Sequence, residues 1–203
     1  MTKTFLETVE GRRSIYALGK EKPIPQQRVE EIVRHAITHV PSPFNSQSSR
    51  TVLLFGEQSN ELWNIVKETL RTVVPPEAFE GTSAKIDSFN AGWGTVLFFE
   101  DQKTVKGLQE QFPLYADNFP IWSLQSNGML EFTVWTALEN EGLGASLQHY
   151  NPLIDEAVKK HWDLDPEWKL LAQMPFGSVA APAGDKEFMP IDQRLVIPAY
   201  KKD

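Results

Sequence analysis

The sequence predicts one domain in which helices alternate with short strands, and three observations indicate this. The chain has 203 residues, a length typical of one domain with a full core. Several segments have apolar residues at helical spacing, and short apolar runs ended by glycine or proline lie between them. Hydrophobic residues make up 41% of the chain, which excludes a disordered or fibrous protein. We therefore expect a single domain over residues 1–203.

The first half of the chain predicts helices and strands in turn. Thr4 and Glu7 have the spacing of a capping box, which begins a helix that ends at Gly11. Pro25 begins a second helix at a position where its missing N–H costs nothing, and Pro41 ends that helix. The elements expected next are a strand over 51–55, a helix carrying the apolar residues of 62–73 that Pro75 and Pro76 break, and a strand over 95–99.

The second half predicts one long helix and several short elements. A helix from about Pro120 to Glu141 is apolar on more than one face, so it lies either in the core or in a subunit interface. Gly142 ends it as a left-handed cap. The remaining expectations are a strand over 145–148, a helix that Asn151-Pro152 begins, strands over 168–174 and 177–179, and an extended apolar tail over 194–197.

Composition narrows the classes of partner. The net charge is -7 and the pI is about 5.2, which argues against a broad basic face for nucleic acid or an anionic membrane. No apolar run reaches the roughly 18 residues of a membrane span, and the N-terminus lacks the apolar core of a signal peptide. The chain has no cysteine, so disulfides and thiolate sites are excluded. We expect a cytoplasmic protein.

Arginines near both ends of this acidic chain indicate an anion site. Arg12 and Arg13 precede Ser14 near the start, and Arg194 lies in the C-terminal tail. The planar fork of arginine suits a phosphate especially well. We infer a phosphate-bearing organic cofactor, flavin mononucleotide (FMN).

The segment 41–50 is a long loop with two prolines and many polar side chains. Its Asn45 and Gln47 are long enough to reach the edge of a heterocycle, and the prolines stiffen the backbone that carries them. The alternative is a solvated loop capped by serines. Likewise, the six Trp and twelve Phe residues are either simple core filling or neighbours of a planar ligand.

Three other kinds of site are disfavoured. His35 and His39 have the i, i+4 spacing of a metal pair, but a histidine at a helix end is equally suited to the helix dipole. Gly92-Trp93-Gly94 lacks the third glycine of a dinucleotide fingerprint and precedes a strand. The chain has no Gly-x-Ser-x-Gly elbow of a hydrolase.

Taken in order along the chain, these motifs resemble the nitroreductase family of flavoproteins. The resemblance is carried by Arg12-Arg13-Ser14, the loop 41–47 and Arg194, and it covers essentially the whole chain. The segments 92–101 and 142–152 look like the family's fatty-acid repression mutant branch. The resemblance implies an α+β fold with a mixed, mainly antiparallel sheet flanked by helices. It also implies an obligate homodimer that exchanges its C-terminal strand and holds FMN at the interface.

Site residues follow from the resemblance by position. Arg12 and Ser14 match contacts to the phosphate and ribityl chain, with Arg13 between them, and Arg194 matches a C-terminal phosphate arginine. The other matches are Asn45 and Gln47 in the partner-subunit loop at the ring, Lys85 near ring atoms N1 and O2, and His149 and Tyr150 in the loop whose backbone faces N5. No metal site is implied.

Three positions depart from the family pattern. Tyr16 stands where a basic residue near the ring is common, which leaves Lys85 as the positive charge there. Asp192 stands where a second C-terminal basic residue is common, and Lys186 is the candidate replacement. The 41–50 loop has Pro43 and Ser48 where serine and proline are usual.

Two functions remain open. The first is an FMN-dependent oxidoreductase that passes electrons from NADH or NADPH to nitroaromatics, quinones or related acceptors by a ping-pong route. The second is a flavin-binding redox regulator of a lipid or stress response with little turnover. No further basic cluster for a 2′-phosphate is evident, which favours NADH.

Overall fold

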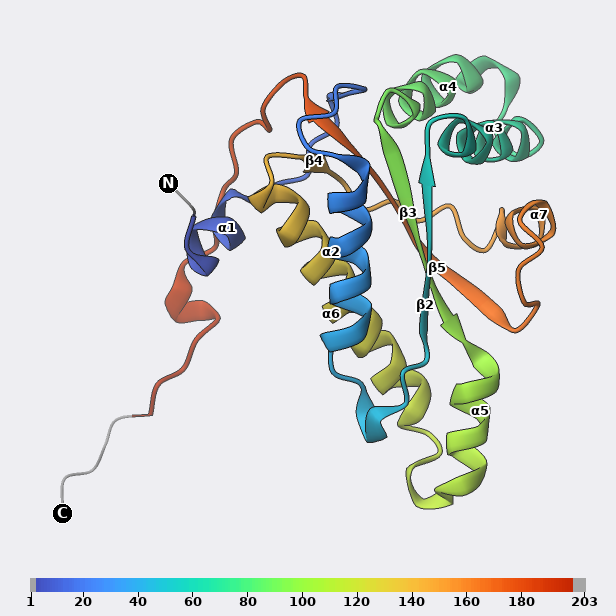
Figure 1. Ribbon diagram of the computed structural model, residues 1–203, viewed down its shortest axis with the longest axis vertical. Helices are drawn as coiled ribbons and strands as arrows, with labels where there is room; N and C mark the ends of the chain where they lie inside the picture. Colours follow the sequence, from blue (N-terminus) through green and yellow to red (C-terminus); the bar gives the residue numbers. More distant parts are fainter. Residues whose placement is uncertain (1–2, 199–203) are drawn as a thin grey trace.

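The computed structural model describes residues 3–198, and at its centre an antiparallel sheet lies between two layers of helices (Figure 1). Its strands are β1 (Leu18–Gly19), β2 (Ser49–Phe55), β3 (Gly94–Asp101), β4 (Gly144–Ala145) and β5 (Trp168–Val179). They are arranged in the order β1-β5-β3-β2, with β4 also paired to β5, and every pairing is antiparallel. One isolated parallel bridge, between Ser14 and Ala145, joins the sheet to the N-terminal segment. The α+β prediction is confirmed.

Helices cover both faces of this sheet. The helices between residues 3 and 198 are α1 (Phe5–Gly11), α2 (Gln26–His39), α3 (Glu57–Arg71), α4 (Pro76–Asn90), α5 (Gln102–Gln111), α6 (Phe119–Asn140) and α7 (Asp155–His161), of which α1 and α5 pack against α6. Short 3-10 turns are η1 (Pro43–Asn45), η2 (Pro113–Tyr115) and η3 (Ile191–Gln193). In Figure 1, α2 and α6 lie on one side of the sheet, and α3, α4 and α7 lie on the other.

The alternation of side chains along β3 produces two cores. Val96 and Phe98 pack against α2 and α6, whereas Leu97 and Phe99 pack against α3, α4 and α7. All four are fully buried, because a central strand has neighbours on both faces. This double burial explains why the segment is an uninterrupted apolar run in the sequence.

Several predicted boundaries are confirmed. The Thr4 hydroxyl accepts from the Glu7 backbone N–H, and the Glu7 side chain accepts from the Thr4 backbone, which completes the capping box. Helix α1 ends at Gly11, and α6 lies within one residue of its predicted ends. Gly142 follows α6 with a φ of +80°, the left-handed conformation expected of a C-terminal cap.

The prediction for Asn151-Pro152 is wrong. Helix α7 begins only at Asp155, after a turn. The side chain of Asn151 accepts a hydrogen bond from Gln173 Nε2 (3.3 Å), so it is turned toward the sheet and caps no helix. The predicted strand over 145–148 is also too long, because β4 ends at Ala145. Opposite this segment lies Pro175, which has no N–H to continue the ladder.

Two helices of the structure, α4 and α5, are not predicted from the sequence. Pro75 and Pro76 end α3 as expected, but Pro76 is also the first residue of α4, whose apolar positions are sparse. Helix α5 buries only Val105, so it has little apolar periodicity. Its start is set by Asp101, whose side chain accepts from the N–H groups of Lys103 and Thr104. Strand β5 is continuous where two strands are expected.

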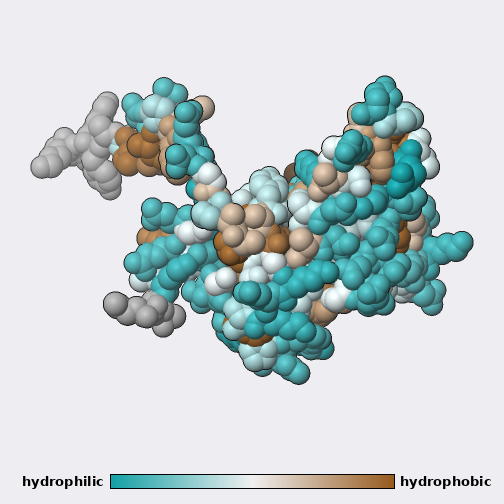
Figure 2. Space-filling model, turned by 90° about the horizontal axis from the view of Figure 1, so that it is seen from above, coloured by the Kyte–Doolittle hydropathy of each residue, from teal (hydrophilic) through white to brown (hydrophobic). Residues whose placement is uncertain are grey.

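The C-terminal segment leaves the sheet after β5. It runs away from the body (Figure 1), and its Leu195, Val196 and Ile197 are exposed. Figure 2 shows brown, hydrophobic surface on the part that projects from the molecule. Between residues 3 and 198 no helix combines the length and hydrophobicity needed to cross a bilayer.

Candidate functional site

A basic cavity of about 440 Å³ lies where the N-terminal segment meets the chain after β5. Its lining residues come from two short stretches of sequence, 12–17 and 182–186. Three of them are cationic, namely Arg12, Arg13 and Lys186, and Asp185 is the acid among them. Ser14 adds a hydroxyl. This donor set suits an organic anion such as a phosphate ester.

Arg12 is placed by helix α1. It is the residue that follows the helix, and its N–H donates to the carbonyl oxygen of Thr8 (2.9 Å). Its guanidinium carbon lies 4.3 Å from the centre of the Trp135 ring on α6. Burial and the neighbouring charge of Arg13 lower the pKa of Arg12, an effect that Glu139 opposes. The guanidinium therefore lies where an added negative charge would be stabilised.

Arg13 and Ser14 tie this segment to the rest of the cavity. Arg13 Nη2 donates to the carbonyl oxygen of Gly184 (2.8 Å), which joins the two stretches that form the lining. Ser14 forms a bridge with Ala145, and Ile15 N–H donates to the Ala145 carbonyl oxygen (2.9 Å). These bonds fix the backbone that carries Arg12, Arg13 and Ser14 to the edge of the sheet.

Phe89 on α4 brings three predicted site segments together. Its ring centre is 6.4 Å from that of Tyr16 and 6.4 Å from that of Tyr150. Lys85 lies one turn earlier on α4 and is exposed. The structure therefore places the N-terminal segment, the Lys85 helix and the 149–150 loop around one aromatic ring.

The 149–150 loop is held by a buried glutamine. Tyr150 N–H donates to Gln173 Oε1 (2.7 Å), and Gln173 is fully buried in β5. Burial raises the pKa of the Tyr150 hydroxyl, so the phenol stays neutral at physiological pH. His149, the residue before it, is exposed.

Asn45 and Gln47 lie elsewhere in the chain. Their loop follows α2, whereas Arg12 lies near the end of α6, so the two sites are at opposite ends of this helix pair (Figure 1). Helix α2 alone spans roughly 21 Å at about 1.5 Å per residue. Within one chain these amides do not reach the basic cavity.

The loop that carries them has a defined and strained backbone. Phe44, Asn45 and Gln47 have φ angles of 56°, 51° and 48°, which place all three in the left-handed region. Gln47 N–H donates to the hydroxyl of Ser42 (2.9 Å), and Arg50 Nη1 donates to the Gln47 carbonyl oxygen (2.6 Å). Strain of this kind is maintained only where the surroundings impose it, and it is concentrated at functional sites.

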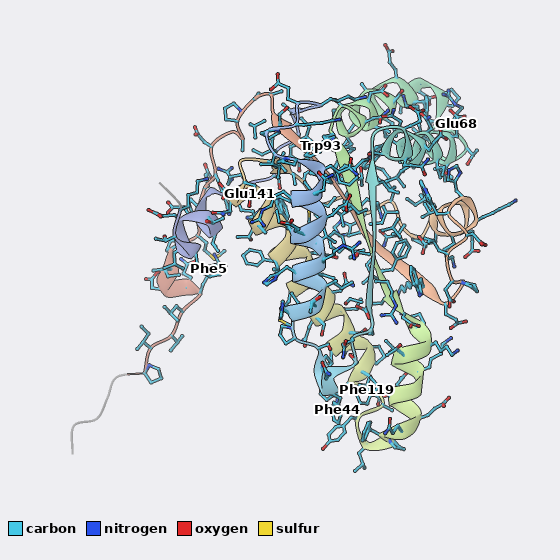
Figure 3. All side chains as sticks on the ribbon, in the orientation of Figure 1. Phe5, Phe44, Glu68, Trp93, Phe119 and Glu141 are labelled. Atoms are coloured by element: carbon cyan, nitrogen blue, oxygen red, sulfur yellow. The ribbon has the colours of Figure 1, made fainter. Side chains whose placement is uncertain are left out.

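Aromatic side chains surround Phe44. Its ring centre is 4.8 Å from that of Phe112 and 5.4 Å from that of Phe119, and Figure 3 shows Phe44 and Phe119 side by side. Phe44 remains 52% exposed, so this end of the molecule presents an aromatic surface next to Asn45 and Gln47.

Arg194 does not line the basic cavity of its own chain. It follows η3 in the C-terminal segment, its N–H donates to the Ile191 carbonyl oxygen (2.9 Å), and it is exposed. Lys186, the candidate replacement for the base missing at Asp192, does line the cavity.

Sequence reasoning missed Trp135, Phe89 and Arg50. Trp135 and Phe89 belong to apolar helix positions, where a core role and a site role look alike in one sequence. For Arg50, the sequence offers one indication of its role: it follows Gln47 by three residues, and an arginine at the end of a polar loop can donate hydrogen bonds to the backbone of that loop.

Together, an α+β sheet with a basic cavity at its edge and a strained polar loop at its far end define a protein built to bind an anionic organic molecule. Residues 9–178 match the model of the nitroreductase family. The Saccharomyces cerevisiae protein HBN1 is 36% identical over 194 residues, 95% of this chain and 96% of HBN1. The nitroreductase FRM2 of the same yeast is 31% identical over 190 residues, 93% of this chain and 94% of FRM2.

Solved structures agree with these matches. The nitroreductase CinD of Lactococcus lactis in complex with chloramphenicol has a TM-score of 0.90 and 49% identity, covering 97% of this chain and 100% of CinD. CinD in complex with 4-nitrophenol has a TM-score of 0.88 and 48% identity, covering 97% of this chain and 100% of CinD. This chain belongs to the nitroreductase family, and it is a flavin-dependent oxidoreductase.

Proposed function

We propose that this chain is an FMN-dependent oxidoreductase that takes electrons from NADH or NADPH and passes them to nitroaromatics, quinones or related acceptors by a ping-pong route. The observation that carries the proposal is the basic cavity of Arg12, Arg13, Ser14 and Lys186 in a nitroreductase fold. The complexes of CinD with chloramphenicol and 4-nitrophenol, both nitroaromatics, support the acceptor class.

The cavity fits the phosphate end of FMN. Within residues 3–198 nothing hydrogen-bonds to the Arg12 guanidinium, Ser14 offers a hydroxyl, and Lys186 brings a further positive charge. Each charge-assisted hydrogen bond is worth about 1.5–3 kcal/mol, so two or three of them account for tight retention of a phosphate ester. We assign Arg13 the role of closing the cavity, because its side chain already bonds to Gly184.

FMN, when bound, supplies the ring that accepts and donates electrons. Lys85 would stabilise the negative charge that the ring acquires on reduction, because it lies one turn before Phe89 on α4, and the Phe89 ring packs against Tyr16. Tyr150 and His149 would border the ring, with the Tyr150 backbone held by Gln173. The neutral Tyr150 phenol adds no competing charge at that border.

We further propose a homodimer in which the Asn45 and Gln47 loop of one subunit completes the site of the other. Within one chain that loop lies far from the basic cavity, so a second copy is the natural way to bring them together. Exposed apolar side chains support this: on α6 they are Ile121, Leu124, Met129 and Phe132, and on α1 they are Phe5 and Leu6. Arg194 and the exposed tail would cross to the partner in the same assembly.

The test of the catalytic role is steady-state oxidation of NADH, and separately of NADPH, with 4-nitrophenol-type and quinone acceptors. Turnover near the roughly 10 per second of a typical enzyme, with parallel lines in double-reciprocal plots, supports a ping-pong oxidoreductase. Turnover several orders of magnitude lower with every acceptor would favour a flavin-binding redox regulator instead. Sedimentation of the same sample tests the dimer, and a flavin-loaded monomer would contradict it.

A further inference from the structure

Trp135 supports the Arg12 side chain from the opposite element. The guanidinium carbon of Arg12 lies 4.3 Å from the centre of the Trp135 ring, which is half-buried on α6. Helix α1 is fixed to the same end of α6 by two further links. The Thr8 hydroxyl donates to Asn140 Oδ1 (3.3 Å), and Lys3 forms an ion pair with Glu139. The point at which Arg12 leaves α1 is therefore fixed relative to the Trp135 ring.

The guanidinium of Arg12 has its hydrogen-bonding capacity free. Over residues 3–198 no hydrogen bond or ion pair engages its side-chain nitrogens, whereas Arg13 is bonded to Gly184. Glu139, the acid whose charge acts on Arg12, is paired with Lys3. A cation over an aromatic face is attracted by the ring quadrupole and consumes none of its N–H donors.

We propose that Trp135 is the positioning residue of the phosphate site: its ring holds the Arg12 guanidinium at the cavity while the guanidinium donors stay free for the phosphate of FMN. The proposal rests on the proposed function, because it takes the anion to be that phosphate. An unheld arginine would lose its rotamer freedom only on binding, so a preset one binds more tightly. Trp135 itself touches the arginine and need not touch the cofactor.

Comparing FMN with riboflavin isolates the effect. Riboflavin has the same ring and ribityl chain without the phosphate. The dissociation constant of riboflavin divided by that of FMN therefore reports on the phosphate site alone. The ratio is measured on full-length, flavin-free protein by quenching of flavin fluorescence. For Trp135→Leu we expect FMN affinity to fall about 2- to 30-fold, from the strength of a cation–π contact, with riboflavin affinity nearly unchanged.

Two further variants serve as a milder substitution at Trp135 and as a control elsewhere in the protein. Trp135→Phe retains a weaker aromatic face and most of the apolar volume, so the ratio should fall roughly 2- to 5-fold. This variant measures the contribution of the Trp135 ring even if Trp135→Leu does not fold. Trp162→Leu is the matched control, because Trp162 packs against the opposite core and its indole N–H bonds to Gln58. Its ratio should equal that of the wild type.

The outcomes separate this inference from the proposed function. Equal losses for FMN and riboflavin in Trp135→Leu, or an unchanged ratio in Trp135→Phe, would overturn the positioning role. If Arg12→Gln lowers the ratio and neither Trp135 variant does, the phosphate site stands and the inference fails. If wild-type protein binds riboflavin as tightly as FMN, the phosphate site itself is wrong.

Discussion

Arg50 holds the backbone of Gln47 by a hydrogen bond of 2.6 Å from Nη1 to the Gln47 carbonyl oxygen. The other arm of the same guanidinium donates to Asp101 Oδ2 (2.7 Å), and its carbon lies 5.9 Å from the centre of the Trp168 ring. One side chain thus connects the strained loop to the end of β3. This arrangement maintains a φ of 48° at Gln47.

Arg50→Ala should loosen this loop and destabilise the protein. The loss removes charge-assisted hydrogen bonds and leaves Asp101 without its cation, for an expected cost of about 1–3 kcal/mol. Arg50→Lys keeps the charge but not the fork, so its cost should be intermediate. Urea unfolding measures the effect. The control is Lys106→Ala, which removes an exposed ion pair with Glu167 and should change stability by less than about 0.5 kcal/mol.

Gly144→Ala should disturb the basic cavity. A Cβ at Gly144 would lie 2.9 Å from Cβ and Cγ2 of Ile15, closer than real contacts allow, so the segment that carries Ser14 must move. We expect FMN affinity to fall at least severalfold, with a loss of stability of about 1–3 kcal/mol from overpacking. Gly107→Ala is the control, because a Cβ there meets nothing within 4 Å and helix propensity favours alanine by roughly 1 kcal/mol. A Gly144→Ala protein with unchanged stability and FMN affinity would show that Ile15 yields freely.

Glu131 predicts a pH dependence of stability. Burial on α6 raises its pKa from 4.5 to about 7 in the folded protein. Between these values the folded state binds the proton and the unfolded state does not, so the free energy of unfolding decreases as pH rises from about 4.5 to 7 and is level above that. Glu131→Gln cannot ionise and should be more stable than wild type at pH 8, by about 1–3 kcal/mol.

Urea unfolding at pH 5 and pH 8 checks this prediction. The difference between the two proteins should be small at pH 5 and largest at pH 8. A difference that is the same at both pH values would mean that Glu131 titrates normally and that the amide acts by another route.

Lys85→Met should act on the electron-transfer step more than on cofactor binding. If its ammonium lies beside the ring, removing it lowers the midpoint potential of the bound flavin by the equivalent of about 1–2 kcal/mol, a plausible value for a partly solvated charge. Slower reduction by NADH with nearly unchanged FMN affinity is the expected pattern. The control is Lys20→Met, an exposed lysine beyond β1. Equal potentials in Lys85→Met and wild type would make Lys85 a surface residue.

Much of the fold was predictable because local rules and tertiary packing agree there. The capping box at Thr4, the left-handed cap at Gly142 and the buried run of β3 each leave a pattern in the sequence. The pattern fails where a contact distant in sequence decides. Gln173 draws Asn151 away from a helix cap, and Asp101 begins a helix with too few apolar residues to be recognised.

The candidate site also has a part that the sequence predicts and a part that depends on contacts between distant segments. Arg12, Arg13 and Ser14 are adjacent in sequence and line one cavity together with Lys186. Trp135 could not be assigned, since its contact with Arg12 depends on how α1 packs against α6. Asn45, Gln47 and Arg194 do not line the cavity of their own chain, so their roles in the site rest on the proposed dimer and stay predictions.

The identity of the flavin tests the central claim most directly. The purified protein should be yellow, and denaturation should release FMN, identified by mass, at one molecule per chain. Release of FAD in place of FMN would contradict the single-phosphate cavity of Arg12, Arg13 and Lys186. A colourless protein that also fails to take up added FMN would contradict the account as a whole.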